Sequence, residues 1–175
     1  MPLNSLILSL FLVFSIFFDL QVGLAAEELK KTVILPFQVY SKANARELQK
    51  GINEALTDQL RKIRGIELIA EGQVMRMVEG KVINDSLISM LGKQTGAAFV
   101  ITGSLTELGD IISVNVRIMD VRKGVFSPVI FAQGRVSEGV GPIIARLIGD
   151  MLIRMGTEQR IARIEIKGSR RIESG

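Results

Sequence analysis

The chain of 175 residues contains no cysteine, no histidine and no tryptophan, and only one tyrosine. Without cysteine there is no disulfide, no thiolate metal site and no cysteine for lipid attachment. Without histidine, the commonest general base and the commonest metal ligand are both missing. The shortage of aromatic rings argues against stacking platforms for single-stranded nucleic acid. These absences favour a binding protein over a metalloenzyme, a thiol enzyme or a nucleic-acid-binding protein.

Charge gives little direction, because Lys and Arg are mostly interleaved with Asp and Glu and the net charge is only +4. This pattern is typical of a solvated surface of mixed charge. The densest basic segment is the C-terminal tail, where cations alternate with isoleucines. The alternation favours one wet strand face, and contact with an anionic partner or with lipid headgroups is the functional alternative. The basic residues of this tail are Arg160, Arg163, Lys167, Arg170 and Arg171.

The N-terminal segment is typical of an export signal. The apolar run over residues 6–18 is shorter than the roughly 20 residues that span a bilayer. Asp19 ends the run, and Gly23-Leu24-Ala25 supplies small residues where a signal peptidase cleaves. Residues 1–25 are therefore predicted to be a signal peptide, with a mature chain from Ala26. Residues 1–5 carry no Lys or Arg, so a true start further upstream or an uncleaved anchor remains the alternative. The absence of cysteine favours a bacterial periplasm.

The first part of the mature chain predicts a strand, a helix and a second strand. Residues 31–39 are rich in β-branched and aromatic residues, and Pro36 indicates that the second half of this strand is an edge or the entry to a turn. Asn44 and Glu47 have the spacing of a capping box, and Gly65 is the predicted end of the helix. Residues 66–70 form the second strand, parallel to the first. The expected apolar helix face comprises Leu48, Ile52, Ala55, Leu56, Leu60 and Ile63.

The second part predicts more helices and a meander. A short helix within residues 72–85 is broken at Gly80, and a second helix over 86–94, capped by Asn84 or Asp85, stops at Gly96. Strands are expected over 97–105, 112–120 and 126–136, because the first is continuously apolar and the second alternates. Gly141-Pro142 opens a last helix, with Pro at its first position. Its apolar face comprises Ile144, Leu147, Ile148, Met151, Leu152 and Met155.

This order predicts an α/β fold. A single domain has a mixed sheet, in which a βαβ unit precedes an antiparallel meander, and helices cover the sheet. After a short linker at 26–30, the domain spans residues 31–155. A second linker at 156–160 leads to an orphan strand and turn at 161–175. A lone strand is not stable by itself, so this segment is expected to enter another sheet.

Several segments resemble chemical motifs only superficially. Residues 139–144 (GVGPII) follow a strand and open a helix, but Ile144 stands where a dinucleotide loop has its third glycine. Gly80-Lys81 and Gly92-Lys93 lack the rest of a phosphate loop. Ser104 and Ser113 have no histidine to activate them. We therefore expect no catalytic, cofactor-binding or metal-binding residue and no nucleotide binding. Core filling is the expected role of the methionines at helical spacing, Met75, Met77, Met151 and Met155.

One resemblance covers about residues 31–155. Residues 97–105 (AAFVITGSL), after a helix that ends in Thr95-Gly96, resemble the TolB N-terminal domain and related envelope proteins of the FlgO and CsgG types. In those proteins a helix leads into a strand of the pattern Gly-Ala-hydrophobic-Val-hydrophobic-Thr-Gly-Ser. Residues 116–124 (VRIMDVRKG) are similar to their hairpin turn, with Arg122-Lys123 replacing the usual polar pair. This resemblance implies an envelope domain but no particular activity, because that fold serves several envelope machines.

A second resemblance covers the tail. Residues 161–172 (IARIEIKGSRRI) are similar to the first strand and turn of a POTRA domain, with Ser169 where the family usually has Asn. The two resemblances together imply the N-terminal region of an outer-membrane protein assembly factor of the BamA type. Such a module is periplasmic, associated with the outer membrane and non-catalytic. It adds strands of envelope proteins or outer-membrane protein clients to a sheet edge, and binds no small-molecule substrate and no nucleic acid. A self-contained envelope protein of the TolB or FlgO type is the alternative.

Overall fold

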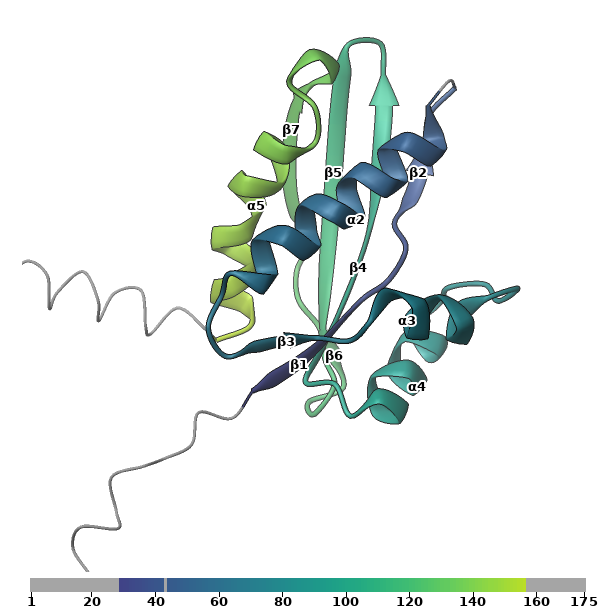
Figure 1. The fold of residues 1–175 in the computed structure, drawn as a ribbon, viewed down its shortest axis with the longest axis vertical. Helices are drawn as coiled ribbons and strands as arrows, with labels where there is room; N and C mark the ends of the chain where they lie inside the picture. Colours follow the sequence, from purple (N-terminus) through teal and green to yellow (C-terminus); the bar gives the residue numbers. More distant parts are fainter. Residues whose placement is uncertain (1–28, 43, 157–175) are drawn as a thin grey trace, which may run out of the picture.

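The computed structural model describes residues 29–42 and 44–156, which form one mixed α/β domain (Figure 1). Its central feature is a seven-stranded sheet with the order β3-β1-β4-β5-β6. β2 also pairs with β4, and β7 also pairs with β5. The strands are β1 (Lys30–Ile34), β2 (Gln38–Tyr40), β3 (Ile66–Leu68), β4 (Phe99–Leu108), β5 (Ile111–Asp120), β6 (Val125–Phe126) and β7 (Ile130–Arg135).

The predicted βαβ unit is confirmed, because β1 runs parallel to β3 and to β4. The segment expected as one strand over 31–39 is two strands, since the chain is interrupted around Pro36 between β1 and β2. Phe37 turns into the core there and is completely buried. Its ring occupies the place where Gly103 of β4 would carry a side chain, so glycine is required at that position.

The second part of the sheet is the predicted antiparallel meander. β4 and β5 form a hairpin with ten paired positions, and Gly109 in its turn has a φ of 64°. The strand expected over 126–136 is two strands, because residues 127–129, which include Pro128, separate β6 from β7. Both segments pair antiparallel with β5.

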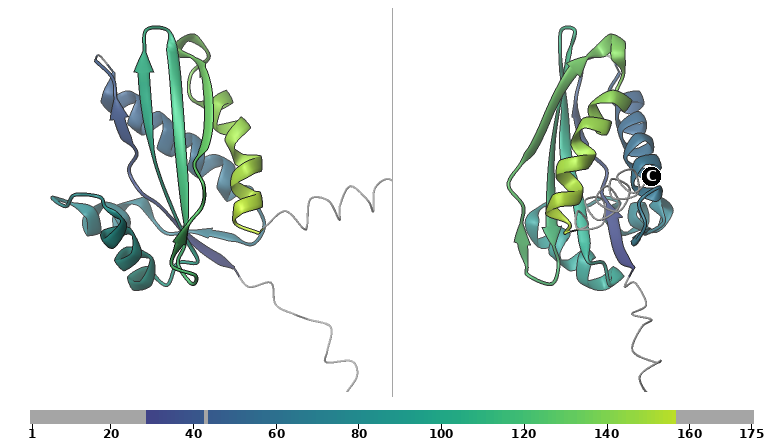
Figure 2. Two further views of the ribbon diagram at one scale, coloured as in Figure 1. Left: turned by 180° about the vertical axis from the view of Figure 1, so that it is seen from behind. Right: turned by 90° about the vertical axis from the view of Figure 1, so that its left-hand side faces the viewer.

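The described part of the chain contains four α-helices, which cover the sheet unequally (Figure 2). α2 (Ala45–Arg61) and α5 (Gly141–Arg154) lie side by side over one face, and α3 (Glu71–Val78) and α4 (Asp85–Thr95) cover only the end of the other face where β1 begins. Two core clusters follow from this arrangement. The larger includes Ile52, Leu56, Leu105, Val114 and Leu147, and the smaller includes Val33, Leu35, Val74, Leu91 and Val100.

The helix faces are as predicted. Ile52, Leu56 and Leu60 of α2 are fully buried, while the other three members of that face are partly buried against the same core. All six predicted positions of the last helix face are buried. Met151 and Met155 fill the core as expected, but Met75 is 47% exposed, so that prediction is wrong for Met75 because it lies on the outer side of a short helix.

Helix ends are partly different from the prediction. Asn84 caps α4, since its side chain accepts a hydrogen bond from the Leu87 N–H at 2.9 Å, and Gly96 ends that helix in the left-handed conformation. For α2 the capping box is wrong, because the side chain of Asn44 makes no capping hydrogen bond. The helix also ends at Arg61 with Lys62 as its cap, whereas Gly65, at a φ of 80°, lies in the turn before β3.

The predicted signal peptide at 1–25 and the predicted POTRA-like segment at 161–175 lie outside the described residues. None of the helices within the described ranges combines the length and the apolar character needed to cross a membrane.

Candidate functional site

The sheet has a large surface that no helix covers. On β5 the residues Ile112, Val114, Val116 and Ile118 face the core under α2 and α5. Because side chains alternate along a strand, the intervening residues face the opposite side. Figure 2 (left) shows that side uncovered beyond α3 and α4. We call this surface the open face; it comprises Gln38, Tyr40, Ser104, Thr106, Leu108, Ile111, Ser113, Asn115, Phe131, Gln133 and Arg135.

The strand register aligns the open face in rows. One row crosses all four strands from Gln38 through Ser104 and Asn115 to Phe131. The next row begins at Tyr40 and ends at Gln133. Its middle members are Thr106 and Ser113, which are directly opposite each other on β4 and β5.

Aromatic and aliphatic groups stand at the borders of this polar strip. Tyr40 on β2 is 59% exposed and Phe131 on β7 is 54% exposed. Leu108 and Ile111 are paired beside the hairpin turn, and both are exposed. Exposed rings with small polar residues between them are typical of surfaces that bind other proteins, because the rings supply contact area and the polar groups supply hydrogen bonds.

Two side-chain hydrogen bonds order the open face locally. The Gln133 amide donates to the Ser113 hydroxyl at 3.0 Å, and the Tyr40 hydroxyl donates to the Gln38 side-chain oxygen at 3.1 Å. Arg117 of β5 lies at the end of the open face that adjoins α4. Its guanidinium lies 4.0 Å from the centre of the Phe126 ring and 3.6 Å from the Asp85 carboxylate at the start of α4.

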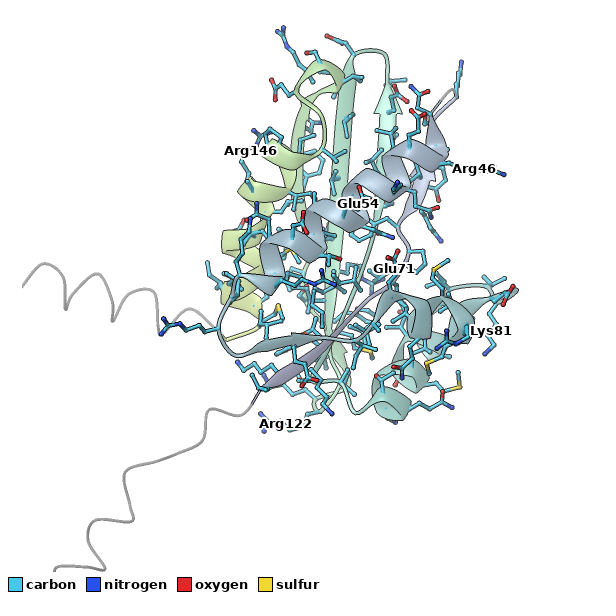
Figure 3. The ribbon with its side chains drawn as sticks, in the orientation of Figure 1. Arg46, Glu54, Glu71, Lys81, Arg122 and Arg146 are labelled. Carbon is cyan, nitrogen blue, oxygen red and sulfur yellow. The ribbon has the colours of Figure 1, made fainter. Side chains whose placement is uncertain are left out.

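The open face is bounded by the edge strand β7. Among the described strands, β7 pairs only with β5. The carbonyl of Gln133 points away from β5, because it accepts a hydrogen bond from the Arg146 side chain of α5 at 2.5 Å. Antiparallel pairs alternate, so the backbone groups of Phe131 and Arg135 also point outward. Figure 3 shows Arg146 on α5 beside this edge.

Other residues weighed in the sequence are not brought together as a reaction centre. Ser104 and Ser113 lie on adjacent strands of the open face, but their direct cross-strand neighbours are Asn115 and Thr106. In the described ranges no group of three acidic or other metal-ligating side chains could hold a metal ion. The described site is thus a surface formed by four strands, and the sequence signal for it was the alternation along residues 112–120.

The three glycine segments have structural roles in the fold. Gly92 is buried within α4, and a side chain there would lie 2.5 Å from Val121. Lys81 follows Gly80 and donates to the Met77 carbonyl at 2.8 Å, at the end of α3. Gly141 begins α5, and Ile143 and Ile144 are fully buried, so the segment 139–144 is the helix start that the sequence indicates.

Comparison with known proteins gives weak similarities. No protein-family model matches the chain, and no curated protein matches it. The LpoB C-terminal domain from Salmonella enterica is similar at 14% identity, over 67% of this chain and 90% of that chain, with a TM-score of 0.47. Lipoprotein GNA1162 from Neisseria meningitidis is similar at 14% identity, over 73% of this chain and 97% of that chain, with a TM-score of 0.47.

TolB from Acinetobacter baumannii is similar at 17% identity, over 59% of this chain and 23% of that chain, with a TM-score of 0.41.

Proposed function

We propose that this domain is a non-catalytic protein-interaction module of the periplasm, and that it belongs to an outer-membrane protein assembly factor of the BamA type. The observation that carries the proposal is the open face. α2 and α5 cover the opposite face of these strands, whereas Tyr40 and Phe131 stand exposed on this one. Another protein could pack its apolar side chains against the two rings and form hydrogen bonds with the polar rows between them.

The proposed mode of binding is strand addition at β7. This edge is six residues long, against three for β2 and three for β3. An added strand would receive main-chain hydrogen bonds from the edge and would place alternate side chains beside Phe131 on the open face. The Arg146 guanidinium already donates a hydrogen bond to the Gln133 carbonyl in the middle of this edge. Strand addition there requires this hydrogen bond to be broken.

Hydrogen exchange tests the mode of binding with an internal control. The outward amides of Phe131, Gln133 and Arg135 should exchange quickly in the free protein, and the inward amides of Ala132 and Gly134 slowly. A synthetic peptide with the alternating pattern of an outer-membrane strand should protect the outward amides. The same peptide with proline at every second position should not, because proline donates no hydrogen bond. Binding that leaves the outward amides unprotected would contradict strand addition.

Substitution tests the open face itself. Phe131→Ser should weaken peptide binding by tenfold or more, because Phe131 lies on β7 beside the added strand. Tyr40→Ser should change this affinity little, because Tyr40 lies on β2, which β4 and β5 separate from β7. Val82→Ser is the matched control, because Val82 is 81% exposed but lies in the loop between α3 and α4. Equal affinity of all three variants would contradict a role of the open face.

The alternative function is a self-contained envelope protein of the TolB or FlgO type, which uses the same open face as a binding module. The reading frame beyond Gly175 separates the two proposals. A continuation into POTRA repeats favours the assembly factor, and a stop codon at that point favours the alternative. We further propose that export removes residues 1–25. N-terminal sequencing of exported protein should then begin at Ala26, and an intact residue 1 would indicate an anchor instead.

A further inference from the structure

A second feature lies at the opposite end of the sheet from the β4–β5 turn. A hollow of about 760 Å³ is formed there by the beginnings of β1 and β4, the turn after β5 and the end of α5. Five basic side chains and a single carboxylate line it. They are Lys30, Lys31, Arg122, Lys123, Arg154 and Asp120. Figure 3 shows Arg122 at this end of the molecule.

Two of the five cations are already engaged. The Lys30 ammonium donates to the carbonyls of Met155 and Gly156, at 2.8 and 3.1 Å, and so caps the end of α5. The Lys123 ammonium lies 3.1 Å from the Asp120 carboxylate. Lys123 thus neutralises the only carboxylate among the described residues of the hollow, and Lys30 compensates the partial negative charge at the end of α5.

In the part of the chain that the structure describes, the other three cations are in no ion pair, although Arg122 also acts electrostatically on the Asp120 carboxylate that Lys123 pairs with. All three residues are exposed, and the side chains of Lys31, Arg122 and Arg154 make no hydrogen bond or ion pair to any residue in the described ranges. They come from three segments far apart in the sequence, yet they line the same hollow. Three unpaired cations in one concave surface create a positive potential that attracts an anion.

Apolar side chains at the rim narrow the class of anion. Leu29 is 56% exposed and Ile153 is 47% exposed, and both line the hollow. A small soluble anion makes no use of exposed aliphatic groups. A membrane surface does, because aliphatic side chains enter the boundary between headgroups and acyl chains while Lys and Arg contact the phosphates.

We propose that this basic hollow binds the phosphate of an anionic phospholipid headgroup, so that this end of the domain rests on a membrane surface. Lys31, Arg122 and Arg154 supply the phosphate contacts, and Leu29 and Ile153 supply the apolar contacts. The open face then extends away from the membrane, since the hollow and the β4–β5 turn lie at opposite ends of the sheet. This inference is independent of the proposed protein partner.

Vesicle binding of the full chain tests the proposal. Partition is measured on vesicles of phosphatidylcholine alone and with 30 mol % phosphatidylglycerol, because the ratio cancels any insertion of residues 1–25. The wild-type chain should prefer the anionic vesicles, and less so as salt is raised. The triple variant Lys31→Gln, Arg122→Gln, Arg154→Gln should lose about fivefold per residue, or roughly a hundredfold of that preference.

Two control variants make the result specific. Lys42→Gln, Arg46→Gln, Arg76→Gln removes the same charge from exposed positions outside the hollow and should retain most of the preference. The second control neutralises the five cations of residues 160–171. The proposal would be overturned if the hollow triple variant and the Lys42/Arg46/Arg76 control lost the preference equally, or if the tail variant alone abolished it.

The source of the phosphate is tested separately. Inorganic phosphate at millimolar concentration should compete only weakly with the anionic vesicles. Tight binding of inorganic phosphate that releases the chain from vesicles would assign the hollow to a soluble anion and overturn the lipid proposal. Thermal melts of the triple variant should match the wild type, because all three substituted side chains are exposed.

Discussion

The Arg146 side chain on α5 donates a 2.5 Å hydrogen bond to the backbone carbonyl of Gln133 on β7. A side chain from a neighbouring helix thereby satisfies a backbone carbonyl in the middle of the β7 edge. Unpaired strand edges invite association with other chains, and a charged side chain placed on the edge limits it. The contact disfavours nonspecific strand pairing at the β7 edge. A partner strand that displaces the Arg146 guanidinium can still pair there.

Arg146→Ala should open this edge. The loss of one exposed, charge-assisted hydrogen bond should lower the free energy of unfolding by about 1 kcal/mol. The same change should raise the affinity for an added strand and promote self-association, measured by sedimentation at increasing protein concentration. Arg46→Ala is the control, because Arg46 is exposed at the start of α2 and far from β7 (Figure 3). Weaker strand binding by Arg146→Ala would show that Arg146 assists the partner.

Two glycine substitutions should have opposite effects. Gly103→Ala places a methyl group against the Asn115 carbonyl and the Phe37 ring, both within the core of the sheet, and should cost about 1–3 kcal/mol of stability or more. Gly149→Ala lies in α5 with no atom near the added group and should stabilise the domain by up to about 1 kcal/mol. Chemical denaturation of both variants measures the difference, and a stabilised Gly103→Ala would mean that Phe37 lies elsewhere.

Much of the fold could be predicted because apolar periodicity depends on local sequence. The burial of Leu56 and Leu147 and the parallel β1–β3 pair follow from such periods. Strand ends were less predictable. Pro36 indicated a change in the first strand, where β1 and β2 are separated, but the interruption at Pro128 between β6 and β7 was not predicted. The side chain of Asn44 likewise makes no cap, although its spacing to Glu47 suits one.

The candidate surfaces could be predicted only in part. Alternation along 112–120 indicated a half-buried strand, but which part of its outer face stays uncovered depends on where α3 and α4 pack. The basic hollow gave no sequence signal, because Lys31, Arg122 and Arg154 are brought together only by the fold.

Charge placed in the core should unfold the domain. Leu56 and Leu147 are 0% and 1% exposed, so Leu56→Asp or Leu147→Asp leaves a carboxylate without a partner and costs several kcal/mol. Ala145→Asp is a matched control in α5, because Ala145 is exposed. Loss of cooperative melting is expected for both leucine variants and not for the control. A cooperatively melting leucine variant would mean that the packing of these helices is different.

The last prediction concerns acid stability at the rim of the basic hollow. Burial raises the pKa of the Asp120 carboxyl, but the backbone N–H and the ammonium of Lys123, with Arg122 nearby, lower it more, so the pKa lies below its usual value of 3.8. A carboxyl with a depressed pKa in the folded state stabilises the fold above its unfolded pKa, and that contribution is lost as the pH falls through the folded pKa. Asp120→Asn removes the ionisable group. The stability advantage of the wild type over this variant should therefore be constant near neutral pH and shrink below about pH 4. Urea denaturation from pH 7 to pH 2 measures it. An advantage that grows on acidification would mean that the Asp120–Lys123 pair does not stabilise the folded state.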